Sequence, residues 1–322
     1  MPRSRAITLL SLATSLFFVP TVFAQNTNSA RPGTINYVEG QATLNGQVLT
    51  SQTNGETVVA PGQSISTTNG KVELLLTPGV FLRLDANSSV TMVSPDLTKT
   101  EVQLDRGRAS LEVDLLYPQN DLLIDLGPAQ TKIVKNGLYE FDATAANMRV
   151  FDGEASVSTA QTAKKWTTVK SHHELALTGD AAKSKDFNPE VAANQDPLYN
   201  WSKLRADYLG QANLALAEQY AGSQSFYPGW NWDPGVYSYT WLPGDGLSWS
   251  PFGYGFYSPW YLFGGGYIYP GYGFRGGFYH GPYRGVSGSV HVAPAPALAG
   301  GGFRGGGFGG GFHGGGGGGG RR

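Results

Sequence analysis

Short runs of alternating apolar and polar residues fill the chain from residue 33 to residue 178. An alternation with a period of two is typical of β-strands, because successive side chains point to opposite faces. The runs at residues 71–76 and 80–84 flank Thr77-Pro-Gly79, which predicts a hairpin. The next predicted strands are residues 89–93, 101–104 and 109–113. We expect a mainly β domain over residues 33–178, an antiparallel β-sandwich or a roll-like fold.

Two dipeptides in this region are typical of two-residue turns. Asn45-Gly46 and Asp152-Gly153 fit a type I′ turn, which needs positive φ at both central positions. The second dipeptide predicts that residues 148–157 form a hairpin.

One amphipathic helix is predicted over residues 196–221, between a linker at 179–195 and an aromatic segment. Asp196 can accept hydrogen bonds from the first turn, and Pro197 suits the first helical position. The predicted helix therefore runs from Pro197 to about Tyr220. Its apolar stripe has a spacing of three and four residues, which indicates a face that packs against the β domain or against a second copy. The stripe comprises Trp201, Leu204, Tyr208, Ala212, Ala215 and Gln219.

The remaining residues form a low-complexity tail in two parts. Residues 222–283 hold 22 aromatic residues among glycine and proline, so this part could bury much apolar surface. Residues 284–322 are rich in glycine and are expected to be disordered. The tryptophans of the first part are the candidate binding residues: Trp230, Trp232, Trp241, Trp249 and Trp260.

The first 24 residues resemble a secretory signal peptide. Two arginines precede an apolar run that ends in small residues, which predicts cleavage between Ala24 and Gln25 and a short linker over residues 25–32. The run is too short to span a bilayer comfortably and no second hydrophobic stretch follows, so no transmembrane helix is expected in the mature chain. We expect an exported protein of the periplasm or cell surface. The chain has no cysteine, which excludes disulfides and thiolate metal sites.

Residues that could perform chemistry are few. His172 and His173 are adjacent on a predicted strand, so their side chains point to opposite faces and do not suit one metal ion. No nucleophile elbow or metalloprotease motif is present, and we predict no enzyme activity, no metal and no cofactor. Most carboxylates are expected on solvated strand faces and turns, including Asp105, Glu112, Asp121, Asp125, Asp152 and Glu154.

The glycine-rich tail contains two motif matches that composition alone explains. Residues 271–276 have the spacing of a dinucleotide-binding loop, but no strand and helix of a βαβ unit flank them. Arg275 and Arg304 each precede two glycines, as in RNA-binding segments. The formal net charge is −1, and few arginines give weak attraction to phosphate. No nucleic-acid partner is expected.

An ordered series of motifs resembles the FecR domain. The series comprises residues 33–46, 61–70, 71–79, 82–90, 104–111 and 150–157. The resemblance covers residues 33–178 and weakens at 126–142. It implies a periplasmic β module. In well-known members, that module reads the state of an outer-membrane iron transporter and is joined through a membrane helix to a segment that controls a sigma factor. We expect only the exported β module to carry over.

Three functions remain open at this point. The first is a non-enzymatic binding or sensing module of the cell envelope with a protein partner. The second is a structural surface protein whose aromatic tail adheres to polysaccharide or to itself, because aromatic faces can stack on sugars. The third is a glycan hydrolase, in which Trp230 and Trp232 would line a sugar cleft together with two carboxylates.

Overall fold

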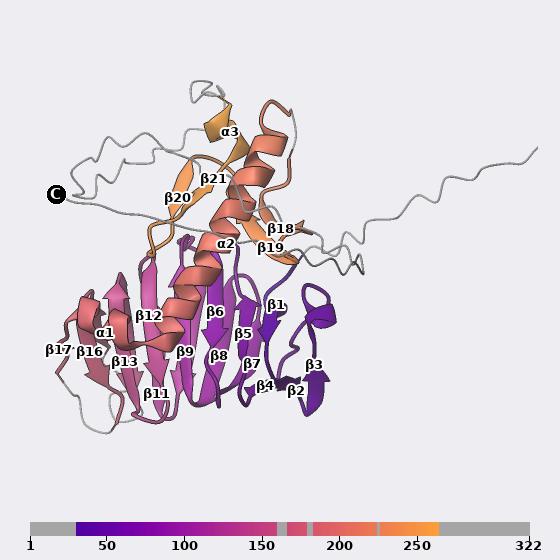
Figure 1. The fold of residues 1–322 in the computed structure, drawn as a ribbon. Coiled ribbons are helices and arrows are strands. Elements are labelled where there is room, and N and C mark those ends of the chain that lie inside the picture. Colours follow the sequence, from indigo (N-terminus) through magenta and orange to yellow (C-terminus); the bar gives the residue numbers. More distant parts are fainter. Residues whose placement is uncertain (1–29, 160–165, 179–182, 224–225, 264–322) are drawn as a thin grey trace, which may run out of the picture. The chain divides into compact units, whose positions relative to one another are not determined.

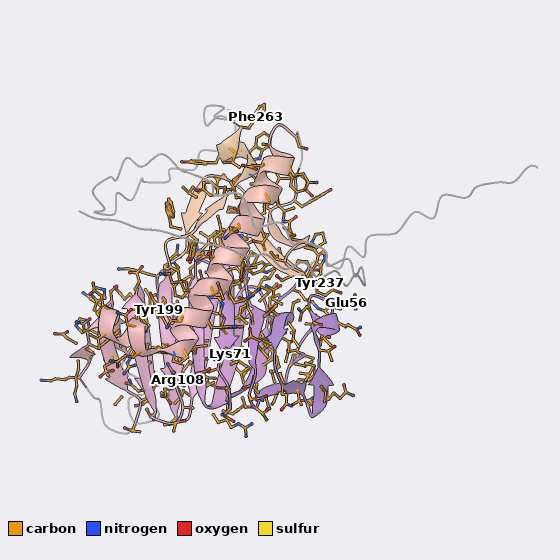
Figure 2. All side chains as sticks on the ribbon, in the orientation of Figure 1. Glu56, Lys71, Arg108, Tyr199, Tyr237 and Phe263 are labelled. Atoms are coloured by element: carbon orange, nitrogen blue, oxygen red, sulfur yellow. The ribbon has the colours of Figure 1, made fainter. Side chains whose placement is uncertain are left out.

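The computed structural model describes residues 30–159, 166–178, 183–223 and 226–263 (Figure 1). The predicted signal peptide with its cleavage site at Ala24 and Gln25 lies outside these residues. The same holds for the predicted disordered tail at 284–322. Figure 2 shows how densely side chains fill the described part.

Two large β-sheets form most of the fold, and we name them sheet A and sheet B. Sheet A has the order β1 (Thr34–Glu39), β5 (Lys71–Leu75), β6 (Val80–Leu84), β9 (Arg108–Val113), β12 (Gly137–Asp142), β13 (Asn147–Asp152), β16 (His173–Ala176), β17 (Lys185–Asp186). Sheet B has the order β15 (Thr167–Lys170), β14 (Glu154–Thr159), β11 (Ala129–Ile133), β10 (Asp121–Leu126), β8 (Lys99–Arg106), β7 (Ser89–Pro95), β4 (Ser64–Thr67), β2 (Ala42–Leu44), β3 (Gln47–Leu49). A short 3-10 helix, η1 (Ser51–Thr53), follows β3.

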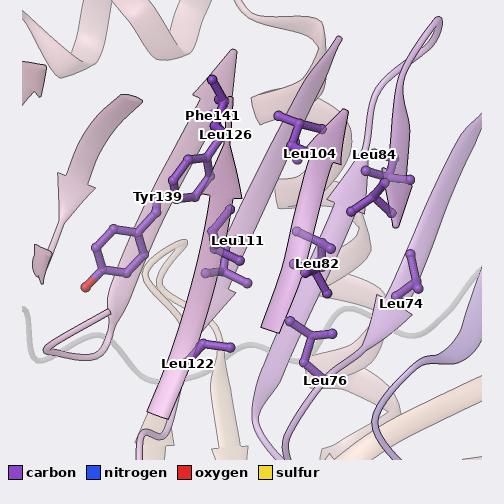
Figure 3. Close-up of a cluster of buried hydrophobic side chains, with 14 of the residues drawn as sticks. Leu74, Leu76, Leu82, Leu84, Leu104, Leu111, Leu122, Leu126, Tyr139 and Phe141 are labelled. Atoms are coloured by element: carbon purple, nitrogen blue, oxygen red, sulfur yellow. The ribbon is translucent and has the colours of Figure 1, made fainter. Parts of the chain in front are cut away.

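The main hydrophobic core is made by apolar side chains of both sheets (Figure 3). Leu82 and Leu111 of sheet A and Leu104 and Leu122 of sheet B are among its buried members. Most strand pairs are antiparallel, whereas β8 and β10 pair in parallel. The predicted mainly β fold is confirmed, because the alternation places one apolar face of each sheet in a shared core.

The two predicted turns have different outcomes. Asn45 and Gly46 have φ values of 47° and 82° and join the antiparallel pair β2 and β3, so this hairpin is confirmed. The predicted hairpin at Asp152-Gly153 is wrong, because β13 belongs to sheet A and β14 to sheet B. Gly153, with φ of 99°, passes so close to the Tyr139 hydroxyl that a Cβ would lie 2.2 Å from it. The turn therefore carries the chain from one sheet to the other.

The helical part begins earlier than the sequence suggests. Helix α1 (Pro189–Gln195) lies inside the segment predicted to be a linker, and the Asn188 side chain caps it. Helix α2 (Pro197–Tyr220) has the predicted bounds, and the Asp196 carboxylate accepts a 2.8 Å hydrogen bond from the amide of Leu198. The linker prediction failed because α1 is short and has no apolar periodicity of its own.

Residues 226–263 also fold, and they cover sheet A together with the helices. Strands β18 (Gly229–Asp233) and β19 (Ser238–Leu242) form one hairpin, β20 (Leu247–Trp249) and β21 (Gly255–Tyr257) form a second, and α3 (Pro259–Leu262) follows. Leu75 and Phe81 of sheet A pack against Leu209, Trp241 and Phe256. We call residues 189–223 and 226–263 the C-terminal layer. It explains why β5, β6 and β9 are buried along nearly their whole length.

Candidate functional site

A network of buried charges joins sheet A to the C-terminal layer. Arg83 on β6 lies between Glu73 on β5 and Glu112 on β9, and all three side chains are inaccessible to solvent. Arg205 on α2 reaches the same Glu73 at 2.8 Å. Burial alone raises the pKa of Glu73, but Arg205 and Arg83 outweigh it and bring the pKa to about 2. This carboxylate therefore stays ionised and holds the helix to the sheet.

A second carboxyl group beside the network has the opposite behaviour. Burial and the neighbouring Glu112 raise the pKa of Asp114 well above its usual value, against the opposing charge of Arg83. The hydroxyl of Ser250, in the C-terminal layer, donates to Glu112. The expectation of a solvated strand face is thus wrong for Glu112. Its burial depends on an arginine and a serine that lie far from it in the sequence.

Two asparagine side chains attach the hairpins of the C-terminal layer. Asn36 on β1 accepts from the amide of Tyr239 at 2.7 Å and donates to its carbonyl at 3.0 Å. Asn213 on α2 accepts from the amide of Tyr257 at 2.6 Å and donates to the carbonyls of Tyr257 and Trp241. Each asparagine side chain therefore both accepts from and donates to backbone groups of a hairpin strand. The sequence holds no local signal for either contact.

A cleft of about 490 Å³ lies between the β9, β12, β13 and β16 part of sheet A and helix α1. Its charged side chains are largely paired with one another. Arg108 donates through one nitrogen, Nη2, to both Glu140 and Asp196. Arg149 donates to Glu174 at 2.9 Å. The ion pair between Arg108 and Asp196 thus attaches the start of α2 to sheet A.

The two carboxyl groups on Arg108 differ in acidity. Burial and the adjacent Asp196 raise the pKa of Glu140 to about 8. Burial also acts to raise the pKa of Asp196, but the hydrogen bond with Glu140 and the charge of Arg108 bring it to about 2. Because both groups accept a hydrogen bond from the same nitrogen of Arg108, they lie closer together than the roughly 5–10 Å that separates the carboxyl groups of glycosidases. Glu140 and Asp196 therefore serve, through Arg108, to hold the start of α2 against sheet A.

The five candidate tryptophans fall into two groups. Trp241 is 1% exposed, Trp230 packs edge-on against Phe81 at 5.1 Å, and Trp232 contacts Tyr239 at 5.2 Å. Trp249 and Trp260 are 59% and 50% exposed. Neither Trp230 nor Trp232 lines the cleft, so these two residues do not form a sugar site with the carboxylates of the cleft. Trp230 and Trp232 are half-buried, and both pack against the buried cluster that contains Phe81 and Trp241.

The exposed Trp249 belongs to a group of rings that we call the aromatic platform: Trp249, Tyr257 and Tyr261. In the β20–β21 pair, Trp249 is opposite Gly255 and Leu247 is opposite Tyr257, so Trp249 and Tyr257 share one face of the hairpin. The Tyr257 ring lies over Gly255, where a Cβ would be 2.9 Å from it. Tyr261 on α3 follows at a ring distance of 6.1 Å from Tyr257.

The predicted stripe on α2 is partly wrong. Trp201 is buried and donates to Glu39 at 2.9 Å, whereas Leu204 and Tyr208 are 47% and 45% exposed. The face of α2 toward sheet A is polar as well as apolar, because the sheet presents charges there. A stripe that is defined by large apolar residues therefore does not identify the buried face of α2. The buried side chains are those of Leu198, Trp201, Ser202, Arg205, Ala206, Leu209, Ala212, Asn213 and Ala217.

The described residues give no sign of a metal site or a membrane helix. Within them, no group of three or more histidine, aspartate or glutamate side chains could hold a metal ion. His172 lies in a turn with φ of 66°, and His173 is 3.0 Å from Asp186. No helix in the described ranges is long and apolar enough to cross a membrane.

Comparison with known proteins gives little. No protein-family model and no curated protein matches the chain. Two crystal structures of a candidate anti-sigma factor from Parabacteroides distasonis align with 41% and 42% of the chain, at 15% and 14% identity and a TM-score of 0.35. The chain covers 64% and 65% of those chains, less than two thirds of their length. A TM-score of 0.35 is too low to transfer a function, and the FecR resemblance stays a prediction.

Proposed function

We propose that the protein is a non-enzymatic, exported binding and sensing module of the cell envelope, with the aromatic platform as its binding surface. The observation that carries this proposal is the exposure of two platform rings, Trp249 and Tyr261, on an otherwise tightly attached layer. Exposed tryptophan and tyrosine side chains held on ordered strands provide large contact areas at a low entropy cost.

The attachment of this layer supports the proposal. The same layer buries Trp241 and is fastened by Asn213, so Trp249 and Tyr257 are presented on a rigid support. Rigid presentation lowers the entropy lost on binding. The sandwich then acts as the scaffold for the platform.

The test is affinity capture from envelope extract with the mature chain as bait. A W249A/Y261A double variant removes two platform rings, and W166A removes an exposed tryptophan next to β15 as a matched control. We expect the wild type and W166A to retain the same partner and the double variant to lose it. Retention of the same partner by all three baits would exclude the platform as the binding surface.

A further inference from the structure

The surface around the platform has an unusual charge composition. Residues 226–263 contain no lysine or arginine, and their acidic residues are Asp233 and Asp245. Protein interfaces typically combine aromatic side chains with arginine at their centres. An anionic partner would find no lysine or arginine in this segment, and a cationic partner would find two carboxylates in it. The chemistry of the surface favours a ligand that is itself neutral.

The geometry of the rings adds a second constraint. Trp249 and Tyr257 lie on one face of the β20–β21 hairpin, and the opposite face carries the buried Phe256 together with Ser248, which donates to the carbonyl of Asp114. The hairpin therefore has one face attached to the core and one face that carries the exposed Trp249 and the half-buried Tyr257. The Tyr261 ring follows at 6.1 Å from the Tyr257 ring, close to the repeat of one sugar residue along a glycan chain, and the two ring planes are tilted by 44°.

Gly255 allows this arrangement. A Cβ at this position would lie 2.9 Å from three atoms of the Tyr257 ring, so any larger residue would push the ring away. With glycine, the ring lies across the position that pairs with Trp249. Aromatic side chains at neighbouring surface positions offer apolar ring faces, and the tyrosine hydroxyl and the indole N–H can form hydrogen bonds.

We propose that the aromatic platform of Trp249, Tyr257 and Tyr261 binds a neutral polysaccharide, whose sugar rings stack on successive aromatic side chains. This inference rests on the proposed function and assigns the ligand class of the same surface. The apolar C–H faces of pyranose rings match the ring faces, and the sugar hydroxyls match the polar tips. No charge on the ligand is required.

The test is native affinity electrophoresis of the full mature chain in gels that contain hydroxyethyl cellulose, dextran, soluble starch or laminarin, with the anionic alginate for comparison. We expect at least one neutral polysaccharide to retard the wild type. W249A/Y261A should bind at least ten-fold more weakly, and W166A should bind as the wild type does. Circular dichroism of each variant establishes that the fold is retained.

G255A is the sharper variant because it keeps all three rings. Its backbone φ is outside the positive range that favours glycine, so the substitution acts by displacing the Tyr257 ring. We expect weaker retardation; wild-type affinity in G255A would assign binding to separate side chains and overturn the platform. No retardation by any neutral polysaccharide, or stronger retardation by alginate, would overturn the ligand class. A protein captured through Trp249 and Tyr261 in the absence of glycan binding would leave the proposed function standing and remove this inference alone.

Discussion

The Nε of Arg83 lies 2.7 Å from the carboxylate of Glu73, and neither side chain is accessible to solvent. The pair lies on the face of sheet A that the C-terminal layer covers. A buried ion pair is costly to form, but removing one partner is costlier still, because the other charge stays buried. Glu73 also pairs with Arg205 of α2, so the buried pair belongs to the network that attaches the layer to the sheet.

Arg83→Met should destabilise the protein strongly. The substitution leaves Glu73 and Glu112 buried with fewer cations, and we expect the free energy of unfolding to fall by about 3–5 kcal/mol. Lys132→Met breaks the exposed pair with Asp121 and should cost less than about 1 kcal/mol. Urea denaturation of both variants measures the difference. Equal losses would show that the buried network contributes no more than a surface pair.

Truncation separates the folded C-terminal layer from the residues that follow it. A chain that ends after Phe263 keeps every described contact, so we expect cooperative unfolding. A chain that ends after Ser223 loses Trp241 and Phe256, which exposes Leu75 and Phe81 of sheet A. We expect that chain to bind the dye ANS and to unfold without a sharp transition. Thermal unfolding followed by circular dichroism distinguishes them, and a sharp transition in the shorter chain would contradict the interpretation.

The period-two alternation predicts the strands correctly because one face of each sheet lies in the shared core. The same pattern misassigns the other face of sheet A. Glu73 at an outward position is expected to meet water, and its burial depends on Arg205, 132 residues later in the chain. Local turn chemistry also leaves open which strands pair, as Asp152-Gly153 demonstrates. The exposed Trp249 and the buried Trp241 have similar local surroundings of glycine and proline, so only the pairing of β20 with β21 distinguishes them.

The stability of the protein should depend on pH through Glu140. Burial and the neighbouring Asp196 raise its pKa from 4.5 to about 8, so the folded protein holds this proton more tightly than the unfolded chain. Stability therefore falls as the pH rises through this range, by at most about 1.4 kcal/mol per pH unit. Arg108 and Arg149 face the same carboxyl group and limit the effect.

Glu140→Gln removes this titration and keeps an amide that can donate to Asp196. We expect its unfolding free energy to change less with pH than that of the wild type between about pH 5 and 8. Asp196, with its pKa of about 2, loses its stabilising contribution only in stronger acid, outside this range. Asp105→Asn, at an exposed position of β8, is the control for the loss of one charge. Identical pH profiles for wild type and Glu140→Gln would exclude this role.

Asp196 has two functions that substitutions can separate. Its Oδ1 caps α2 at the amide of Leu198, and its Oδ2 pairs with Arg108. Asp196→Asn keeps an oxygen for the cap and loses the ion pair, whereas Asp196→Ala loses both. We expect Asp196→Ala to be less stable than Asp196→Asn by about 1 kcal/mol, the usual contribution of a cap. Chemical denaturation measures both, and equal stabilities would show that the cap contributes nothing.

Asn213→Leu tests how the platform is held. Leucine has nearly the same size but cannot bond the amide of Tyr257 or the carbonyl of Trp241, which Asn213 contacts at 2.6 and 2.8 Å. Because buried backbone groups without partners each cost about 1–3 kcal/mol, we expect a loss of about 3 kcal/mol in total. Gln211→Leu, on the exposed face of the same helix, should have little effect.

Hydrogen exchange adds the local readout that global stability lacks. In Asn213→Leu, the amide of Tyr257 should exchange much faster than in the wild type, while the amides of β6 and β9 in the centre of sheet A keep their relative protection. Such a pattern means that the β20–β21 hairpin opens without the sandwich, and the platform rings then lose their fixed spacing. Uniformly faster exchange in both regions would instead mean that the hairpin and the sandwich unfold as one unit, and Asn213 would have no special role in positioning Trp249 and Tyr257.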